Sequence, residues 1–118
     1  MVKSESSWTG WLVRDNNVVL ASVEVPISMK AKMRGLIGRN KIEGAMYFEG
    51  AKFVHTFGMR FTLDIAFVSS KNEVIRTLRL KPNRIIFPVI RSAGIIEAAE
   101  GAFSEWDLQI GQIVETKR

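Results

Sequence analysis

The stretch from His55 to Asp64 holds the side chains of this chain that are best suited to chemistry. It contains the only histidine, and it places two charged residues, Arg60 and Asp64, among aromatic and branched neighbours. It runs directly into the sequence IAFV at 65–68, which is typical of a buried strand. Because polar groups close to a core must be paired or used, we expect a functional site here.

The pattern of this stretch favours a binding surface. If residues 55–67 form one continuous strand, successive side chains lie on opposite faces of it. One face is then apolar apart from His55, and the other is a polar row. The row consists of Thr56, Arg60, Thr62 and Asp64. The Arg60 guanidinium offers a forked donor for a carboxylate or phosphate. A bulge at Gly58 would shift the register and move His55 and Thr56 to the opposite faces of the strand.

A structural role is the alternative for the same residues. Asp64 would then cap or brace a neighbouring loop, with Arg60 as its partner. His55 would be a hydrogen-bonded structural residue rather than part of a site.

The composition excludes several other kinds of site. The absence of cysteine excludes disulfides, thiolate zinc sites, iron–sulfur clusters and cysteine nucleophiles. One histidine and no calcium-loop spacing predict no metal, and the lack of a phosphate loop or a G-x-G-x-x-G motif predicts no cofactor. Ser69 or Ser92 could form a triad with His55 and Asp64, but no G-x-S-x-G elbow accompanies them.

The formal net charge of +5 is unevenly distributed. Five cations lie between Glu24 and Glu43 without an acid, and five more lie between Glu73 and Glu97. Such stretches could attract nucleic acid, an anionic membrane surface, an anionic small molecule or an acidic protein partner. A solvated surface is the simpler interpretation. Nucleic acid is disfavoured because the aromatic residues fall mostly at apolar strand positions rather than among the cations.

The elements that must position these residues are mostly short strands. Strands are predicted over 8–14, 18–25, 45–48, 53–59, 63–68, 73–80, 94–99 and 112–116, with turns at 15–17 and 69–72. Ser28 is the expected N-cap of a helix over about 28–38, which ends at Gly38. Its apolar face would contain Met29, Met33, Leu36 and Ile37.

The remaining segments complete a strand-rich domain. Residues 82–91 are extended but cannot form a central strand at Pro88, and 102–106 form one helical turn. We expect one α+β domain over 1–118: a compact, barrel-like or strongly curved antiparallel or mixed sheet with one principal helix packed against it. The first seven residues lack an apolar run, and no segment approaches the roughly 18 apolar residues of a membrane helix. A cytoplasmic protein is therefore expected.

Several motifs of the chain match a known pattern. They are MRGLIGR at 33–39, GAMYF at 44–48, HTFGMRFTLDIAFV at 55–68, AGIIEA at 93–98 and LQIGQ at 108–112. From about Met29 to Val114 the chain resembles the family called domain of unknown function 192. The resemblance implies a small strand-rich domain whose most recognisable segment contains Met59, Arg60 and Asp64, and it implies no activity.

The chain departs from this family pattern at two positions. It has Thr62 where the family commonly has proline, so the bend before Leu63 is expected to be looser. It has Gln112 where the family often has an acid. Many relatives also begin with an export signal, whereas none is expected for this chain.

The leading hypothesis is a non-enzymatic module that binds a ligand or partner. Its predicted binding residues are His55, Thr56, Met59, Arg60 and Asp64, joined by Arg34 from the helix and Glu97 from a later strand. One alternative is a small hydrolase or isomerase that uses His55 or Asp64 as general acid or base. Another is an electrostatic binder of nucleic acid or of a membrane surface.

Overall fold

The structure of the chain is a computed structural model that describes residues 6–15 and 17–118. Residues 1–5, which belong to the segment expected to lack an export signal, and Asn16 of the predicted turn at 15–17 lie outside the described residues. None of the helices in the described part has the length and apolarity that crossing a membrane requires.

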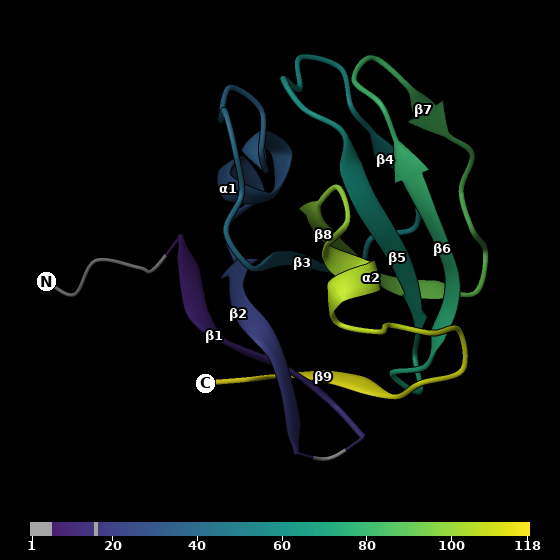
Figure 1. Cartoon of the computed structure of the whole chain (residues 1–118). Coiled ribbons are helices and arrows are strands. Elements are labelled where there is room, and N and C mark those ends of the chain that lie inside the picture. Colours follow the sequence, from purple (N-terminus) through teal and green to yellow (C-terminus); the bar gives the residue numbers. More distant parts are fainter. Residues whose placement is uncertain (1–5, 16) are drawn as a thin grey trace, which may run out of the picture.

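The described chain forms short strands and two very short helices (Figure 1). The helices are α1 (Met29–Arg34) and α2 (Ala102–Glu105). The strands are β1 (Ser7–Arg14), β2 (Val18–Pro26), β3 (Ala45–Glu49), β4 (Val54–His55), β5 (Leu63–Ser69), β6 (Val74–Leu80), β7 (Ile85–Ile86), β8 (Ser92–Ala99) and β9 (Val114–Lys117). The strand-rich α+β class is thus confirmed.

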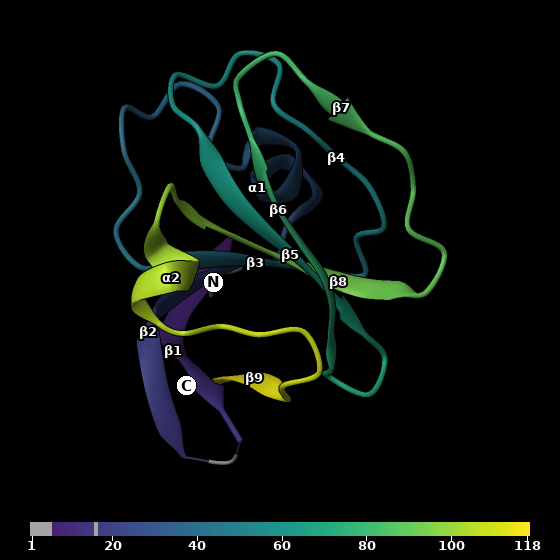
Figure 2. The ribbon, with the colours of Figure 1, turned by 45° about the vertical axis from the view of Figure 1, so that its right-hand side comes forward.

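Most strands belong to one mixed sheet. Its order is β6-β5-β8-β3-β2-β1-β9, and β4 pairs with β7 in a separate two-stranded sheet. Neighbours are antiparallel except β2 and β3, which are parallel. Figure 2 shows β1, β2 and β9 in one part of the bent sheet and β5, β6 and β8 in another.

The expectation of a barrel-like sheet is wrong. The two edge strands, β6 and β9, share no ladder. An isolated bridge between Glu73 and Ile113, flanked by a few backbone hydrogen bonds, joins their ends. Closing a barrel requires continuous pairing of the first and last strands, and one bridge does not provide it.

Strand β5 shows why the core forms where it does. All of Leu63–Val68 is buried, because β5 lies between β6 and β8 in the sheet and is covered on both faces. Successive side chains point to opposite faces. Ala66 and Val68 therefore join one apolar cluster with Leu12 and Phe103, while Ile65 and its alternate neighbours join a second cluster.

The continuous strand over 55–67 on which the polar row was based does not form, and the strand predicted over 53–59 is reduced to β4. Strand β4 ends at His55 and β5 begins at Leu63. The loop between them contains Gly58 with a φ of 79°, which interrupts extended backbone. The alternation that produced the polar row therefore does not apply to this segment.

The helix expected over 28–38 is also shorter than predicted. Ser28 caps it as expected, since its hydroxyl accepts the Ala31 N–H at 3.0 Å. The helix ends at Arg34 because Gly35 adopts a φ of 47°, and α1 contains no buried residue. The structure thus has two short helices instead of one principal helix packed on the sheet, and Leu36, just beyond α1, is the residue that enters the core.

Candidate functional site

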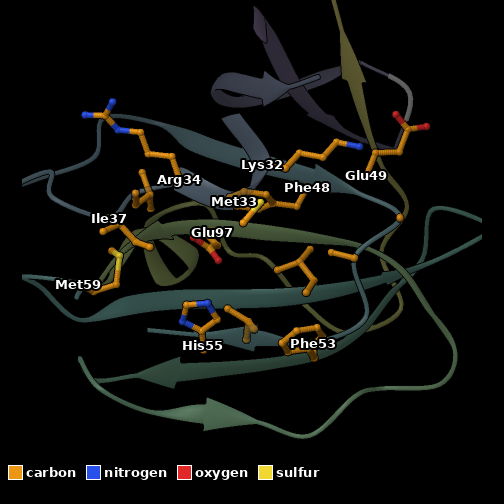
Figure 3. Close-up of a pocket in the computed structure, with 16 residues that line it drawn as sticks. Lys32, Met33, Arg34, Ile37, Phe48, Glu49, Phe53, His55, Met59 and Glu97 are labelled. Atoms are coloured by element: carbon orange, nitrogen blue, oxygen red, sulfur yellow. The ribbon is translucent and has the colours of Figure 1, made fainter. Parts of the chain in front are cut away.

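A cavity of about 350 Å³ opens between α1, the end of β3, the segment leading into β4, and β8 (Figure 3). Its walls are largely apolar. The buried or half-buried apolar side chains that line it are Leu36, Phe48, Ala51, Val54, Met59 and Ile95. We call this cavity the α1–β8 pocket.

The Glu97 carboxyl is the one acidic group inside this pocket that is buried. β8 lies between β3 and β5, with Glu97 opposite Met46 on one side and Ile65 on the other. The residue is only 7% exposed. In Figure 3 its carboxyl lies in the middle of the pocket, between Met33 above it and His55 below. Among the described residues its carboxyl has no hydrogen-bond or ion-pair partner.

Burial changes the acidity of this group. It raises the pKa of the Glu97 carboxyl from 4.5 to about 7, because the charged form loses its hydration. Since the residue lines the pocket and no described residue pairs with it, its carboxyl can interact with what occupies the pocket. At neutral pH this carboxyl can therefore both donate and accept a hydrogen bond from whatever enters the pocket.

Two cations stand at the mouth of the α1–β8 pocket. Lys32 and Arg34 come from α1 and are exposed. Neither side chain forms an ion pair with an acid in the described part of the chain. In Figure 3 the Arg34 guanidinium extends away from Glu97, so this charge lies at the outer end of the pocket, whose lining also includes the exposed Glu49.

His55 lies on the opposite wall. It is exposed, and its Nδ1 accepts the Phe57 N–H at 3.3 Å. The imidazole stacks on the Phe57 ring, with 5.5 Å between ring centroids. The hydrogen bond fixes Nδ1 as an acceptor and leaves Nε2 available at the pocket.

Exposed apolar side chains surround the mouth. Met33 is 72% exposed and lies over Glu97 in Figure 3, and Ile37 and Phe53 are also exposed at the rim. Methionine is unbranched and adapts its shape to a neighbour. The rim can thus accommodate apolar groups of different shape.

The structure brings four of the seven predicted binding residues to this pocket. They are Arg34, His55, Met59 and Glu97. The other three predicted residues, Thr56, Arg60 and Asp64, are absent from its lining. Arg60 is exposed and donates to the Asn40 side chain at 2.9 Å.

Asp64 braces helix α2 instead of forming a surface with Arg60. One carboxylate oxygen accepts the Arg79 Nε–H at 3.0 Å. The other accepts the backbone N–H groups of Gly101 and Phe103, at 3.0 and 3.2 Å. These contacts agree with the alternative that Asp64 caps or braces a neighbouring loop, but the partner of Asp64 is Arg79 and not Arg60. The hydrogen bond and charge of Asp64 raise the pKa of Arg79.

Thr56 is fully buried and fixes the turn before β7. Its hydroxyl donates to the Lys81 carbonyl at 2.6 Å and accepts the Arg84 N–H at 2.9 Å. Backbone groups thus occupy both the donor and an acceptor site of the Thr56 hydroxyl, and it does not serve as a ligand-binding group.

Sequence reasoning missed several pocket residues, notably Lys32, Phe48 and Phe53. In the sequence, Phe48 and Phe53 lie in predicted strands and have no feature that marks a site. Lys32 is one of several cations on or near the predicted helix, which a solvated surface explains equally well. The available signal was Glu97 itself, the only charged residue in the apolar run AGIIEAA at 93–99.

Comparisons with known proteins identify the fold. The family model DUF192, described as uncharacterized ACR, matches residues 12–116. No curated protein gives a significant match. A crystal structure from Sinorhizobium meliloti 1021, named as a candidate transcription regulator, has a TM-score of 0.78 at 17% identity, with 97% of this chain and 98% of that chain covered.

A second solved structure is similar. It is a protein of unknown function from Novosphingobium aromaticivorans DSM 12444, with a TM-score of 0.74 at 17% identity and coverage of 89% of this chain and 83% of that one. At this identity the likeness describes the fold and not the activity.

Proposed function

The chain belongs to the DUF192 family, whose function is unknown, and we propose that it is a binding module for a small molecule held in the α1–β8 pocket. The observation that carries this proposal is the Glu97 carboxyl, which is buried in the cavity and has no partner in the described chain. A largely buried carboxyl that lines an apolar pocket and has no protein partner is the kind of polar group that orients a small ligand.

The pocket also suggests the form of the ligand. Glu97 at the inner end favours a hydrogen-bond donor such as a primary amine. The walls favour an apolar body, and Lys32 and Arg34 at the mouth favour an anionic group at the outer end. We therefore propose a small molecule with an inner amine, an apolar middle and an outer anion.

The predicted binding residues fit this proposal unequally. Arg34, His55, Met59 and Glu97 line the pocket and belong to the proposed site. Asp64, Arg60 and Thr56 have partners elsewhere. The enzyme alternative uses His55 or Asp64 as general acid or base. Both oxygens of Asp64 are held by Arg79 and α2, whereas His55 lines the pocket, and we propose binding without a reaction.

A matched series of probes tests the proposal. ω-Aminohexanoate, hexylamine and hexanoate share an apolar body and differ only at their ends. We expect binding to weaken in that order, measured by amide chemical-shift changes at pocket residues during titration. The Glu97→Gln variant should bind hexylamine at least tenfold more weakly, because an ion pair at a buried site is lost.

The control variants separate the two ends of the ligand. Arg34→Gln should weaken ω-aminohexanoate and leave hexylamine unchanged, while Glu100→Gln, at an exposed acid outside the pocket, should alter neither. The proposal fails if none of the three probes shifts pocket amides, or if Glu97→Gln binds hexylamine as the wild type does.

A further inference from the structure

The segment 82–91, which contains β7, displays the most exposed large apolar side chains of the described chain. Phe87 is 86% exposed and Ile90 is 85% exposed. Both lie outside the lining of the α1–β8 pocket. Apolar side chains grouped on a surface mark interaction sites when they are held in place and form a patch.

Hydrogen bonds to backbone groups fix the end of the segment that carries these two side chains. The Val89 N–H donates to the Lys52 carbonyl at 2.8 Å. The Lys52 ammonium donates to the Ile90 carbonyl at 3.0 Å and to the Ser92 carbonyl at 2.8 Å. Pro88 fixes its own φ angle between them. The exposure of Phe87 and Ile90 is therefore built into the fold.

The surroundings of this segment are positively charged. Every charged residue in 50–63 and in 74–96 is lysine or arginine. A shallow depression beside Ile90 is lined by Arg76 and Arg91 together with apolar side chains. Neither guanidinium has an ion-pair partner among the residues that the structure describes. The two guanidinium groups line this depression with Ile90, and Phe87 directly precedes Pro88, which also lines it. We call these four residues the basic apolar face: Arg76, Phe87, Ile90 and Arg91.

We propose that the basic apolar face docks on the surface of an anionic lipid bilayer. Phe87 and Ile90 enter the boundary between headgroups and acyl chains, where an apolar side chain gains by leaving water. Arg76 and Arg91 contact the lipid phosphates, which guanidinium groups bind with two hydrogen bonds.

The same features disfavour other occupants. A second copy would bring two positively charged faces together, which costs free energy. Single-stranded nucleic acid binds by stacking bases on aromatic rings, and Ile90 has no ring to offer. A lipid surface uses both the aliphatic and the aromatic side chain.

Cosedimentation with vesicles tests this docking. The full chain is mixed with vesicles of phosphatidylcholine alone, or of equal parts phosphatidylcholine and phosphatidylglycerol. We expect it to pellet only with the anionic vesicles. The R76Q/R91Q variant should bind about 25-fold more weakly, since each cation near an anionic surface strengthens binding roughly fivefold, and F87S/I90S should lose binding at least tenfold.

Matched controls exclude general effects of charge and hydrophobicity. K30Q/K41Q removes two cations from the stretch around α1, and V18S/V19S removes two exposed apolar side chains from the β1–β2 hairpin. Both should bind vesicles as the wild type does, and circular dichroism verifies that each variant is folded.

Three outcomes would overturn the proposal. One is equal pelleting with neutral and anionic vesicles, and another is wild-type binding by both variants of the basic apolar face. The third is no pelleting at all while the chain binds single-stranded oligothymidylate or an acidic peptide through the same residues. The pocket variant Glu97→Gln should pellet normally, so this test is independent of the proposed ligand site.

Discussion

Glu97 shows how a single residue can be ordinary in sequence and exceptional in structure. An acid in a strand is commonly exposed at an edge or turned towards water. Here β3 and β5 flank it on both sides, and the carboxyl faces an apolar pocket. The same neighbours that bury it also remove the water that would stabilise its charge, which is why its pKa is raised.

The raised pKa of Glu97 predicts a pH-dependent stability. The carboxyl titrates at about 7 in the folded protein and near 4.5 when unfolded. Between these pH values the folded state binds more protons than the unfolded state, so the free energy of unfolding falls as the pH rises. The contribution of Glu97 to stability is therefore fully present below pH 4.5 and is lost as the pH rises through about 7. Glu97→Gln should remove this loss.

Urea unfolding of the wild type and of Glu97→Gln measures this effect. The variant should gain about 2 kcal/mol relative to wild type between about pH 5 and about pH 8. Glu100→Gln serves as the control, because the Glu100 side chain is exposed and should show no such gain. A constant difference between wild type and Glu97→Gln across this pH range would contradict the prediction.

At the scale of elements, helix α2 depends on a residue far away in the chain. It has only four residues, too few to be stable alone. Gly101 begins it with a φ of 92° and offers no side-chain cap. Asp64 of β5 supplies the missing acceptor for the Gly101 and Phe103 N–H groups.

Replacing Asp64 should therefore release α2. Asp64→Ala leaves the buried Phe103 N–H without a partner, and we expect it to lower the free energy of unfolding by about 3 kcal/mol. Arg79→Gln should cost much less than Asp64→Ala, because the arginine side chain is 54% exposed and solvent screens the pair. Urea unfolding compares them, and equal losses in the two variants would contradict the capping role.

At the scale of the whole molecule, the last strand completes the sheet. β9 pairs with β1 at one edge of the sheet. The preceding residues reach the opposite edge, where the Val74 N–H donates to the Gln112 carbonyl at 2.9 Å. Val114 is buried in the same apolar cluster as Leu12 and Phe103. The C-terminal residues thus join both ends of the bent sheet.

A cavity in this region should weaken the whole fold. Val114→Ala removes two buried methyl groups, and we expect a loss of about 2 kcal/mol in the free energy of unfolding. Val19→Ala, at an exposed position of β2, should change it by less than about 0.5 kcal/mol. Thermal unfolding followed by tryptophan fluorescence measures both, and a silent Val114→Ala would show that β9 is dispensable.

The amino-acid sequence by itself determined the features that depend on near neighbours. Alternating and continuous apolar runs located most of the strands, and Ser28 marked the start of α1 because capping acts within one turn. The conformation of Gly58 and Gly35 was not visible in the same way. Each glycine can adopt either sign of φ, so the ends of β4 and α1 were misplaced.

Only the tertiary structure decided which side chains meet. Arg34, His55 and Glu97 are distant in sequence, yet α1, β4 and β8 bring them to one pocket. Asp64 pairs with Arg79, and not with Arg60, which is nearer in sequence, because β5 lies beside β6 in the sheet. Strand pairing uses the same backbone groups at every residue, so a local pattern can identify a strand, while its partner is selected by the packing of the entire core.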